Sequence, residues 1–205
     1  MTSDEVAATA TASSDARDLP AVVDTLSSAF DEVPIFRWFF PDDERRAAIL
    51  PAFFAAVCEA HLSWGEIHRS ADGLAAAVWV PPGAQMPAEV SATLGERLGG
   101  ILGEEAATKM ADLRPLIRAH HPEGPHWFLN FLAVRPAAQG RGHGTALLAP
   151  MLARCDAEGL PAYLDATSEN NRRLYERHGF TVVAEVALRD SPPLWCMLRE
   201  PREAR

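Results

Sequence analysis

The chain has 205 residues, which fits a single domain with a sizeable hydrophobic core. Hydrophobic residues make up 48% of it, as in ordinary globular proteins, and 28 acidic against 19 basic residues give a formal net charge of −9. This acidity argues against a nucleic-acid-binding protein and suits cationic, amine-bearing ligands, although solubility alone would also account for it.

The sequence gives no indication of export, a membrane span or a metal site. Its three cysteines (Cys58, Cys155 and Cys196) are far apart and odd in number, which favours free thiols in a reducing cytoplasm. The N-terminus lacks the basic and apolar segments of a signal peptide, and no apolar run approaches the ~18 residues of a membrane span. The seven histidines show no His-x-x-x-His spacing. We therefore expect a cytoplasmic protein that meets no membrane and holds no metal.

The first half of the chain predicts helices around one hairpin. Residues 1–5 are expected to be disordered and residues 6–11 to form a strand. Asp18 followed by Pro20 is typical of a helix start, and an apolar stripe continues from there to Phe30. The other elements expected here are a loop or short helix over 34–41, a helix from Asp42 or Asp43 towards His61 that Pro51 kinks or begins, strands 66–70 and 74–80 around an Ala-Asp-Gly turn, and helices 88–98 and 104–120 separated by Gly99, Gly100 and Gly103.

A glycine-rich loop lies between a strand pattern and a helix pattern in the second half. The strand is Trp127–Val134, the loop reads Gln-Gly-Arg-Gly-His-Gly-Thr from Gln139 to Thr145, and the helix covers 146–157. Glycines let the backbone turn tightly and expose N–H groups at a helix N-terminus, where the dipole favours an anion. The loop matches neither the Walker A pattern nor the dinucleotide-binding spacing. By itself it fits a phosphate cradle or a simple helix-capping turn equally well.

A second motif follows the strand expected over 162–166. Asn171 and Tyr175 are four residues apart and share one helix face, and Gly179 ends that helix. Strands over 180–187 and 193–199 complete the pattern. Read from Gln139 as Gln-x-x-Gly-x-Gly, the loop and the Asn-x-x-x-Tyr helix together resemble the GNAT superfamily of acyl-CoA-dependent N-acetyltransferases. The stretches Pro125-His-Trp-Phe-Leu, Leu174-Tyr-Glu-Arg-His-Gly-Phe-Thr-Val and Trp195-Cys-Met are similar to the puromycin N-acetyltransferase family, and the likeness covers about residues 20–202.

The resemblance implies an α/β GNAT fold, with a central mixed, largely antiparallel sheet flanked by helices on both faces. It implies one domain over 1–205 whose acetyl-CoA-binding core covers about 125–185. Tyr175 would be the general acid that protonates the departing thiolate. The residues implied to hold the cofactor acetyl-CoA are Leu132, Ala133, Val134, Gln139, Gly140, Arg141, Gly142, His143, Gly144, Thr145, Asn171 and Tyr175. Ordinary alternatives remain open: strand core for 132–134, a solvated Arg141, a helix-packing Tyr175, and a solvent-facing spacer at His143. Asn171 would contact the pantetheine arm or cap its helix, a role for which Ser168 and Asn170 compete.

The general base is not identified by any motif, because the central strand carries Asn130 and no carboxylate. The candidates are Asp31, Glu32, His61, His126 and Asp165, and a water relay is an alternative to all of them. The residues considered for contact with the acceptor substrate are Trp38, Trp79, Trp127, Asn130 and Asp165. Packing in the core is the favoured role for most of the aromatic residues.

The function expected is transfer of an acetyl group from acetyl-CoA to a small amine, possible examples being antibiotic-like or aminoacyl-nucleoside-like amines. The protein would act as a monomer or homodimer. Three other functions stay open: acetylation of a peptide or protein amine, a non-catalytic acyl-CoA sensor on the same fold, and a phosphate-binding structural domain.

Overall fold

A single sheet organises the computed structural model, which describes residues 11–202. The elements are β1 (Thr11–Ser13), α2 (Leu19–Phe30), α3 (Pro34–Phe39), α4 (Asp43–His61), β2 (Glu66–Ser70), β3 (Ala75–Val80), α5 (Ala88–Leu102), α6 (Glu104–Arg118), β4 (Trp127–Val134), α7 (His143–Glu158), β5 (Ala162–Ala166), α8 (Glu169–Arg177), β6 (Thr181–Val186) and β7 (Leu194–Arg199). The seven strands follow the order β1-β2-β3-β4-β5-β7-β6. Among the strands of residues 11–202, only β4 and β5 pair in parallel, so the sheet is mixed and largely antiparallel, as expected.

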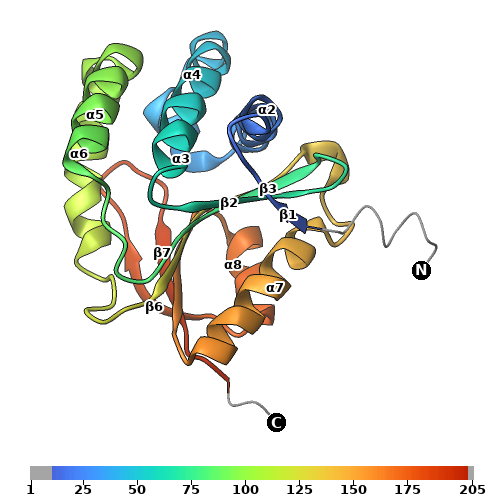
Figure 1. The fold of residues 1–205 in the computed structure, drawn as a ribbon. Helices are drawn as coiled ribbons and strands as arrows, with labels where there is room; N and C mark the ends of the chain where they lie inside the picture. The colour runs from blue at the N-terminus through green and yellow to red at the C-terminus, as the bar shows by residue number, and fades with distance from the viewer. Residues whose placement is uncertain (1–10, 203–205) are drawn as a thin grey trace.

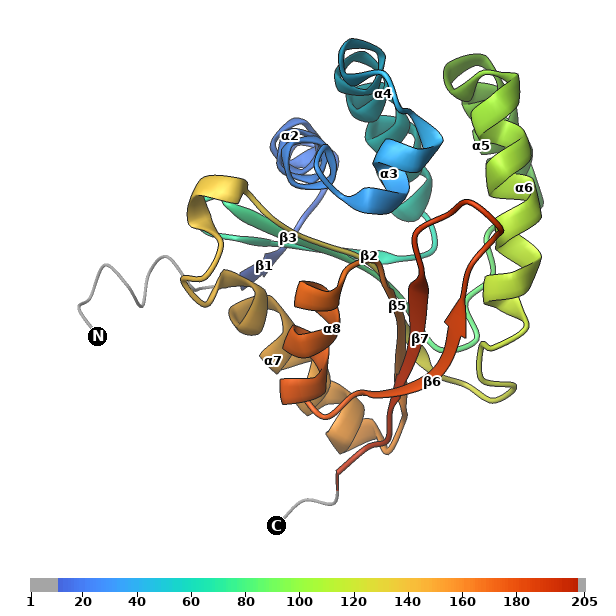
Figure 2. The same cartoon turned by 180° about the vertical axis from the view of Figure 1, so that it is seen from behind.

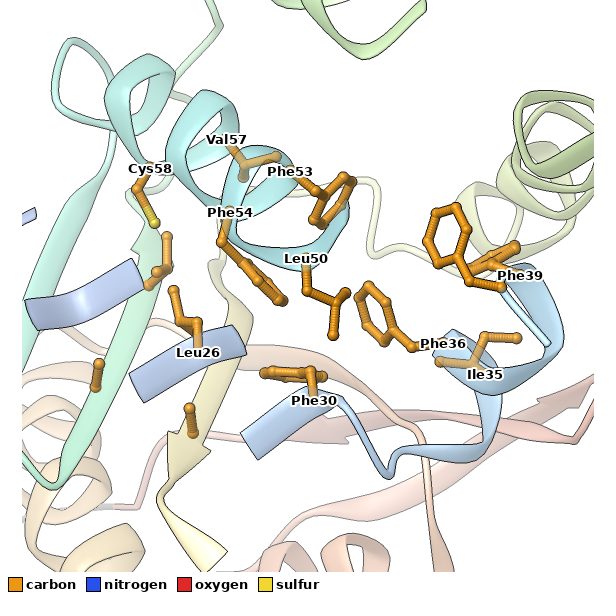
Figure 3. Close-up of a cluster of buried hydrophobic side chains, with 14 of the residues drawn as sticks. Leu26, Phe30, Ile35, Phe36, Phe39, Leu50, Phe53, Phe54, Val57 and Cys58 are labelled. Atoms are coloured by element: carbon orange, nitrogen blue, oxygen red, sulfur yellow. The ribbon is translucent and has the colours of Figure 1, made fainter. Parts of the chain in front are cut away.

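Helices cover both faces of the sheet (Figures 1 and 2). Each helical layer buries its own hydrophobic core against the sheet. Helices α2 to α6 lie over one face, where Phe30, Phe36 and Phe54 pack with ring centroids 5.2–5.7 Å apart (Figure 3). Helices α7 and α8 lie over the other face, on a second core that includes Trp79 and Trp127. The Phe30–Phe36 pair is edge-to-face, a contact that adds stability beyond the apolar area that it buries.

Several expected boundaries differ from those observed. Helix α5 continues through Gly99 and Gly100, and the break comes at Gly103, whose φ of 74° disfavours any other residue. Helix α7 begins at His143, so the end of the glycine-rich loop is already the first helical turn. The strand expected over residues 6–11 lies outside the described residues except for its last residue, where β1 begins. The disorder expected at 1–5 also lies outside them.

Helix α4 illustrates how capping fixes an element. Asp42 accepts a hydrogen bond from the backbone N–H of Arg45 at 2.7 Å, and the helix begins at Asp43. Pro51 therefore lies inside the helix and does not mark its start. The first turn also carries Arg46, which is 1% exposed and paired with Asp31 at 3.0 Å, so it ties α4 to the end of α2.

Candidate active site

The two central strands part in the middle of the sheet. β4 and β5 pair only from Trp127 to Leu129, although β4 continues to Val134 along β3 and β5 continues to Ala166 along β7. Beyond Leu129 their backbone edges face a gap. The parting therefore begins before the stretch from Leu132 to Val134 that the resemblance implies for acetyl-CoA binding.

A β-bulge at Asn130 determines which backbone groups point into the gap. The β3–β4 register shifts there, so that Asn130 is an extra residue on β4. N–H groups alternate between the two edges of a strand, and one inserted residue reverses the alternation. Bulges of this kind are enriched next to active sites because they redirect backbone and side-chain groups.

Two hydrogen bonds on either side of the bulge demonstrate the reversal. The N–H of Trp127 points to the β5 side and donates to the carbonyl of Pro161, just before β5, at 2.9 Å. The N–H of Arg135 points to the β3 side and donates to the carbonyl of Leu74, just before β3, also at 2.9 Å. Alternation back from Arg135 places the N–H groups of Leu132 and Val134 on the gap side, and that of Ala133 on the β3 side.

The glycine-rich loop lies at the end of β4 and leads into α7. Gly140 and Gly142 have φ angles of 75° and 91°, a region that side chains disfavour, and a Cβ on either would meet nothing within 4 Å. Gly142 is also the N-cap of α7, so no side chain caps the first N–H groups of that helix. Open space and uncapped donors at a helix N-terminus suit a phosphate group.

The loop, the strand end and α8 meet at Gly144. A Cβ on Gly144 would lie 3.4 Å from Leu174, 3.8 Å from Val134 and 3.9 Å from Leu132. This glycine therefore permits close packing of α7 on β4 and α8, and its missing side chain points into the protein instead of towards a ligand. The two motifs found in the sequence are adjacent in space.

Tyr175 lies on the buried face of α8. Its ring contacts Phe180 with centroids 5.8 Å apart, and burial raises the pKa of its phenol well above the usual range. The hydroxyl therefore remains protonated at neutral pH and has a proton to donate. Asn171 is half-buried one turn earlier, and Ser168 caps this helix by accepting from the Asn171 N–H at 3.2 Å.

Other side chains of the loop have mixed surroundings. Gln139 donates to the carbonyl of Val134 at 3.1 Å, which ties the loop to the strand end. Thr145 lies 3.1 Å from the Nε2 of His178, while Arg141 is exposed. The alternative that His143 is a solvent-facing spacer is wrong: the ring is buried, with Nδ1 3.8 Å from Asp72, because α7 starts at this residue and turns it inward.

On the face of the sheet that α2 to α6 cover, Asn130 contacts the buried side chain of His61. The Nδ1 of His61 lies 2.8 Å from the carbonyl of Val57, so this nitrogen must donate, and Nε2 then accepts from the Asn130 amide at 3.0 Å. Burial lowers the pKa of His61. Both ring nitrogens are therefore engaged, and His61 is a poor candidate for a general base.

Asp165 lies at the point where the strands part, directly after Leu164, the last β5 residue paired with β4. Its Oδ1 accepts from the Tyr163 hydroxyl at 3.2 Å, and its Oδ2 lies 3.9 Å from Nε2 of His121. Burial raises the pKa of Asp165 to about 6, against smaller opposing effects of hydrogen bonds from Cys196 and Tyr163.

The remaining candidates for base or substrate contact lie in other settings. Asp31 pairs with Arg46, and Glu32 pairs with Arg37 at 2.8 Å on the surface. The Nδ1 of His126 lies 2.8 Å from the Gly124 carbonyl.

Trp79 and Trp127 are 0% and 1% exposed in the core under α7, which removes them from any substrate pocket. Trp38 is half-buried below the ammonium of Lys109. Asn130 and Asp165 are the two that lie at the gap.

Sequence reasoning missed the surroundings of Asp165. Tyr163 could have been found, because residues two apart on a strand share a face. His121 and Cys196 come from a distant loop and a distant strand, and no local signal connects them to Asp165.

Comparison with known proteins finds similarity to acetyltransferases. A model of the acetyltransferase (GNAT) family matches residues 97–180. An uncharacterised N-acetyltransferase of Schizosaccharomyces pombe is 26% identical over 201 residues, covering 91% of this chain and 81% of that protein. A crystal structure from Corynebacterium glutamicum, described as histone acetyltransferase HPA2 and related acetyltransferase, is 29% identical with a TM-score of 0.72 and covers 95% of this chain and 97% of its own. Arylalkylamine N-acetyltransferase 2 of Aedes aegypti, 14% identical with a TM-score of 0.61 over 94% of this chain and 99% of its own, shares the fold.

The described residues show neither a metal-ligating cluster nor a helix that could span a membrane. Residues 11–202 contain no group of three or more His, Cys, Asp or Glu side chains placed to hold a metal ion. No helix in the same range is both long and apolar enough to cross a membrane.

Proposed function

Since the chain is an acyltransferase with the GNAT fold, we propose that it transfers the acetyl group of acetyl-CoA to the amine of a small molecule. The observation that carries this proposal is the gap between β4 and β5. The N–H groups of Leu132 and Val134 point into the gap, and the uncapped N-terminus of α7 lies at the end of the same strand. An elongated ligand with a polar arm and a phosphate group suits that arrangement.

Each part of the site has a role in this reaction. Acetyl-CoA would supply the activated acetyl group as a thioester. Leu132 and Val134 would donate to its pantetheine arm and thioester oxygen, and the loop from Gly140 to Gly144 would bind the pyrophosphate. Tyr175 would give its proton to the departing sulfur, because its buried phenol holds that proton at neutral pH.

A small, cationic amine is the acceptor class that we propose. The net charge of −9 favours attraction of cations, and the similarity to the puromycin N-acetyltransferase family makes an aminoacyl-nucleoside-like or other antibiotic amine the first compound class to test. The C. glutamicum protein is described as a histone acetyltransferase, so a peptide amine is the competing acceptor. The free, buried cysteines (Cys58, Cys155 and Cys196) support a cytoplasmic location for the reaction.

The test is release of free thiol from acetyl-CoA in the presence of puromycin, aminoglycosides, polyamines, amino acids and short peptides. Turnover with one of the small amines is the expected result. Turnover confined to peptides would show that the acceptor is a peptide amine and not a small molecule. Tight binding of acetyl-CoA without turnover on any amine would instead favour an acyl-CoA sensor, and equal binding of ADP and acetyl-CoA would favour a phosphate-binding domain.

A further inference from the structure

Acetylation of a protonated amine requires a group that removes a proton from the ammonium. We infer that the Asp165 carboxylate is this general base, an assignment that rests on the proposed acetyl transfer. Three features of Asp165 support this role: its place in the sheet, the side chains that surround it, and the absence of a cationic partner within residues 11–202.

Asp165 lies where the gap between β4 and β5 begins. It follows Leu164, the last β5 residue that pairs with β4. Tyr163 and Cys196 belong to the core under α2 to α6, whereas Leu164 and Ala166 belong to the core under α7 and α8. Strand alternation therefore directs Asp165 to the α2–α6 face, opposite α7 and its glycine-rich loop. An acceptor that approaches from this face would meet the carboxylate where the two strands separate.

The side chains around Asp165 are electrically neutral. Tyr163 on its own strand donates to Oδ1, Cys196 on β7 is its cross-strand partner, and Nε2 of His121 is 3.9 Å from Oδ2. Buried or half-buried acidic residues elsewhere have arginine partners, as Asp156 does in its two contacts with Arg199. Within residues 11–202 no lysine or arginine forms an ion pair with Asp165.

The neighbouring histidine does not supply the missing positive charge. Burial, followed by the charges of His126 and Arg118, lowers the pKa of His121 to about 4. His121 is thus neutral at pH 7 and leaves the carboxylate without a counter-ion. The pKa of about 6 for Asp165 makes it mostly ionised at pH 7 and yet a stronger base than a surface carboxylate. With 15% of its side chain exposed, it remains accessible to an acceptor.

In this reaction Asp165 removes a proton from the amine on one side of the gap, and Tyr175 donates a proton to the sulfur on the other side. One ammonium proton passes to the Asp165 carboxylate and then to solvent, and the amine lone pair attacks the thioester carbon. As the C–N bond forms and the C–S bond breaks, Tyr175 protonates the sulfur. A second proton leaves the nitrogen and restores the Tyr175 hydroxyl. The products are the amide, coenzyme A with a free thiol, and one proton in solution.

The test is the pH profile of kcat/KM for Asp165→Asn, with the best acceptor of the panel whose amine titrates well above pH 8. The amide keeps an oxygen that can accept from Tyr163, so the fold should be retained. We expect a rate about 10²–10⁴-fold lower at pH 7, the usual contribution of an acid–base group. The wild-type rate should be level above about pH 6, whereas the variant rate should rise about tenfold per pH unit, because only neutral amine would then react. Glu32→Gln, the matched control on the surface, should behave as the wild type.

The outcomes separate this assignment from the proposed function. An Asp165→Asn variant that keeps the wild-type rate, or that loses rate equally at every pH, overturns the base assignment while acetyl transfer stands. A wild-type protein that turns over no amine overturns the proposed function and the assignment together. Acetyl-CoA affinity should be the same in both proteins, because Asp165 lies on the face opposite the phosphate loop, and a large loss of affinity would also contradict the assignment.

Discussion

Asp165→Asn should make the protein more stable at neutral pH, even as it removes the proposed base. Burial raises the pKa of this carboxyl from its ordinary 3.8 to about 6. The charged form is thus less favourable in the folded protein than in the unfolded chain. An asparagine amide keeps the size and the hydrogen-bond acceptor but carries no charge to desolvate.

The sign and size of the effect follow from linkage. Because the folded-state pKa is the higher one, the folded state binds this proton more tightly, and the stability that it provides is fully present below about pH 4. It is lost as the pH rises to about 6. One pH unit corresponds to about 1.4 kcal/mol, so a pKa raised from 3.8 to about 6 destabilises the native state by up to about 3 kcal/mol above pH 6. In a chain of 205 residues that corresponds to roughly 6–12 °C in Tm.

Thermal unfolding of the two proteins between pH 4 and 8 measures this difference and needs no knowledge of the acceptor. The Tm of the variant should exceed that of the wild type by an amount that grows from pH 4 to 6 and is level above. Asp31→Asn is the control of opposite sign, because Asp31 pairs with the buried guanidinium of Arg46. A Tm difference that does not depend on pH, or a wild type that is the more stable protein at pH 7, would show that Asp165 is not desolvated as argued.

Three further outcomes are expected. Tyr175→Phe should lower kcat about 10²–10⁴-fold with little change in acetyl-CoA affinity, and an unchanged kcat would remove Tyr175 from the acid role. Tyr163→Phe removes the hydrogen bond that lowers the pKa of Asp165, so the acid limb of the pH–rate profile should move to higher pH; a shift to lower pH would contradict this. Gly142→Ala should weaken acetyl-CoA binding about tenfold, because a side chain at a φ of 91° costs about 1–2 kcal/mol. Titration calorimetry measures this affinity, and the control Gly99→Ala within α5 should leave it unchanged. Equal affinities for the two glycine variants would show that the loop conformation is irrelevant to binding.

The elements that the sequence predicted well are those with strong local signals. The strand from Trp127 to Val134 has the predicted bounds, and α8 ends just before Gly179 as expected. A period-2 or period-3.6 pattern and a capping residue are sufficient to define such elements. The failure at Gly99 and Gly100 has a physical reason, because a glycine costs an exposed helix only about 1 kcal/mol and neighbouring turns can compensate.

The spatial relation of the two motifs could be predicted only through the resemblance. Neither the loop nor the α8 helix indicates that Gly144 contacts Leu174, because that contact depends on how β4 and β5 order the sheet. The bulge at Asn130 also has no sequence signature. Register shifts arise from the pairing of two strands, so a single strand does not encode them.

The case of Asp165 shows most clearly why a site needs tertiary structure. As a sequence position it is one of several acidic residues with an equal claim to the base role. Asp31 and Asp165 differ only in their surroundings: one faces a buried guanidinium, and the other faces a phenol, a thiol and a neutral imidazole. A counter-ion stabilises a carboxylate and makes it a weak base, while neutral, apolar surroundings do the opposite. The residue that costs the fold stability is therefore the one best suited to take a proton, which is why its stability and its kinetics should change in opposite directions when the charge is removed.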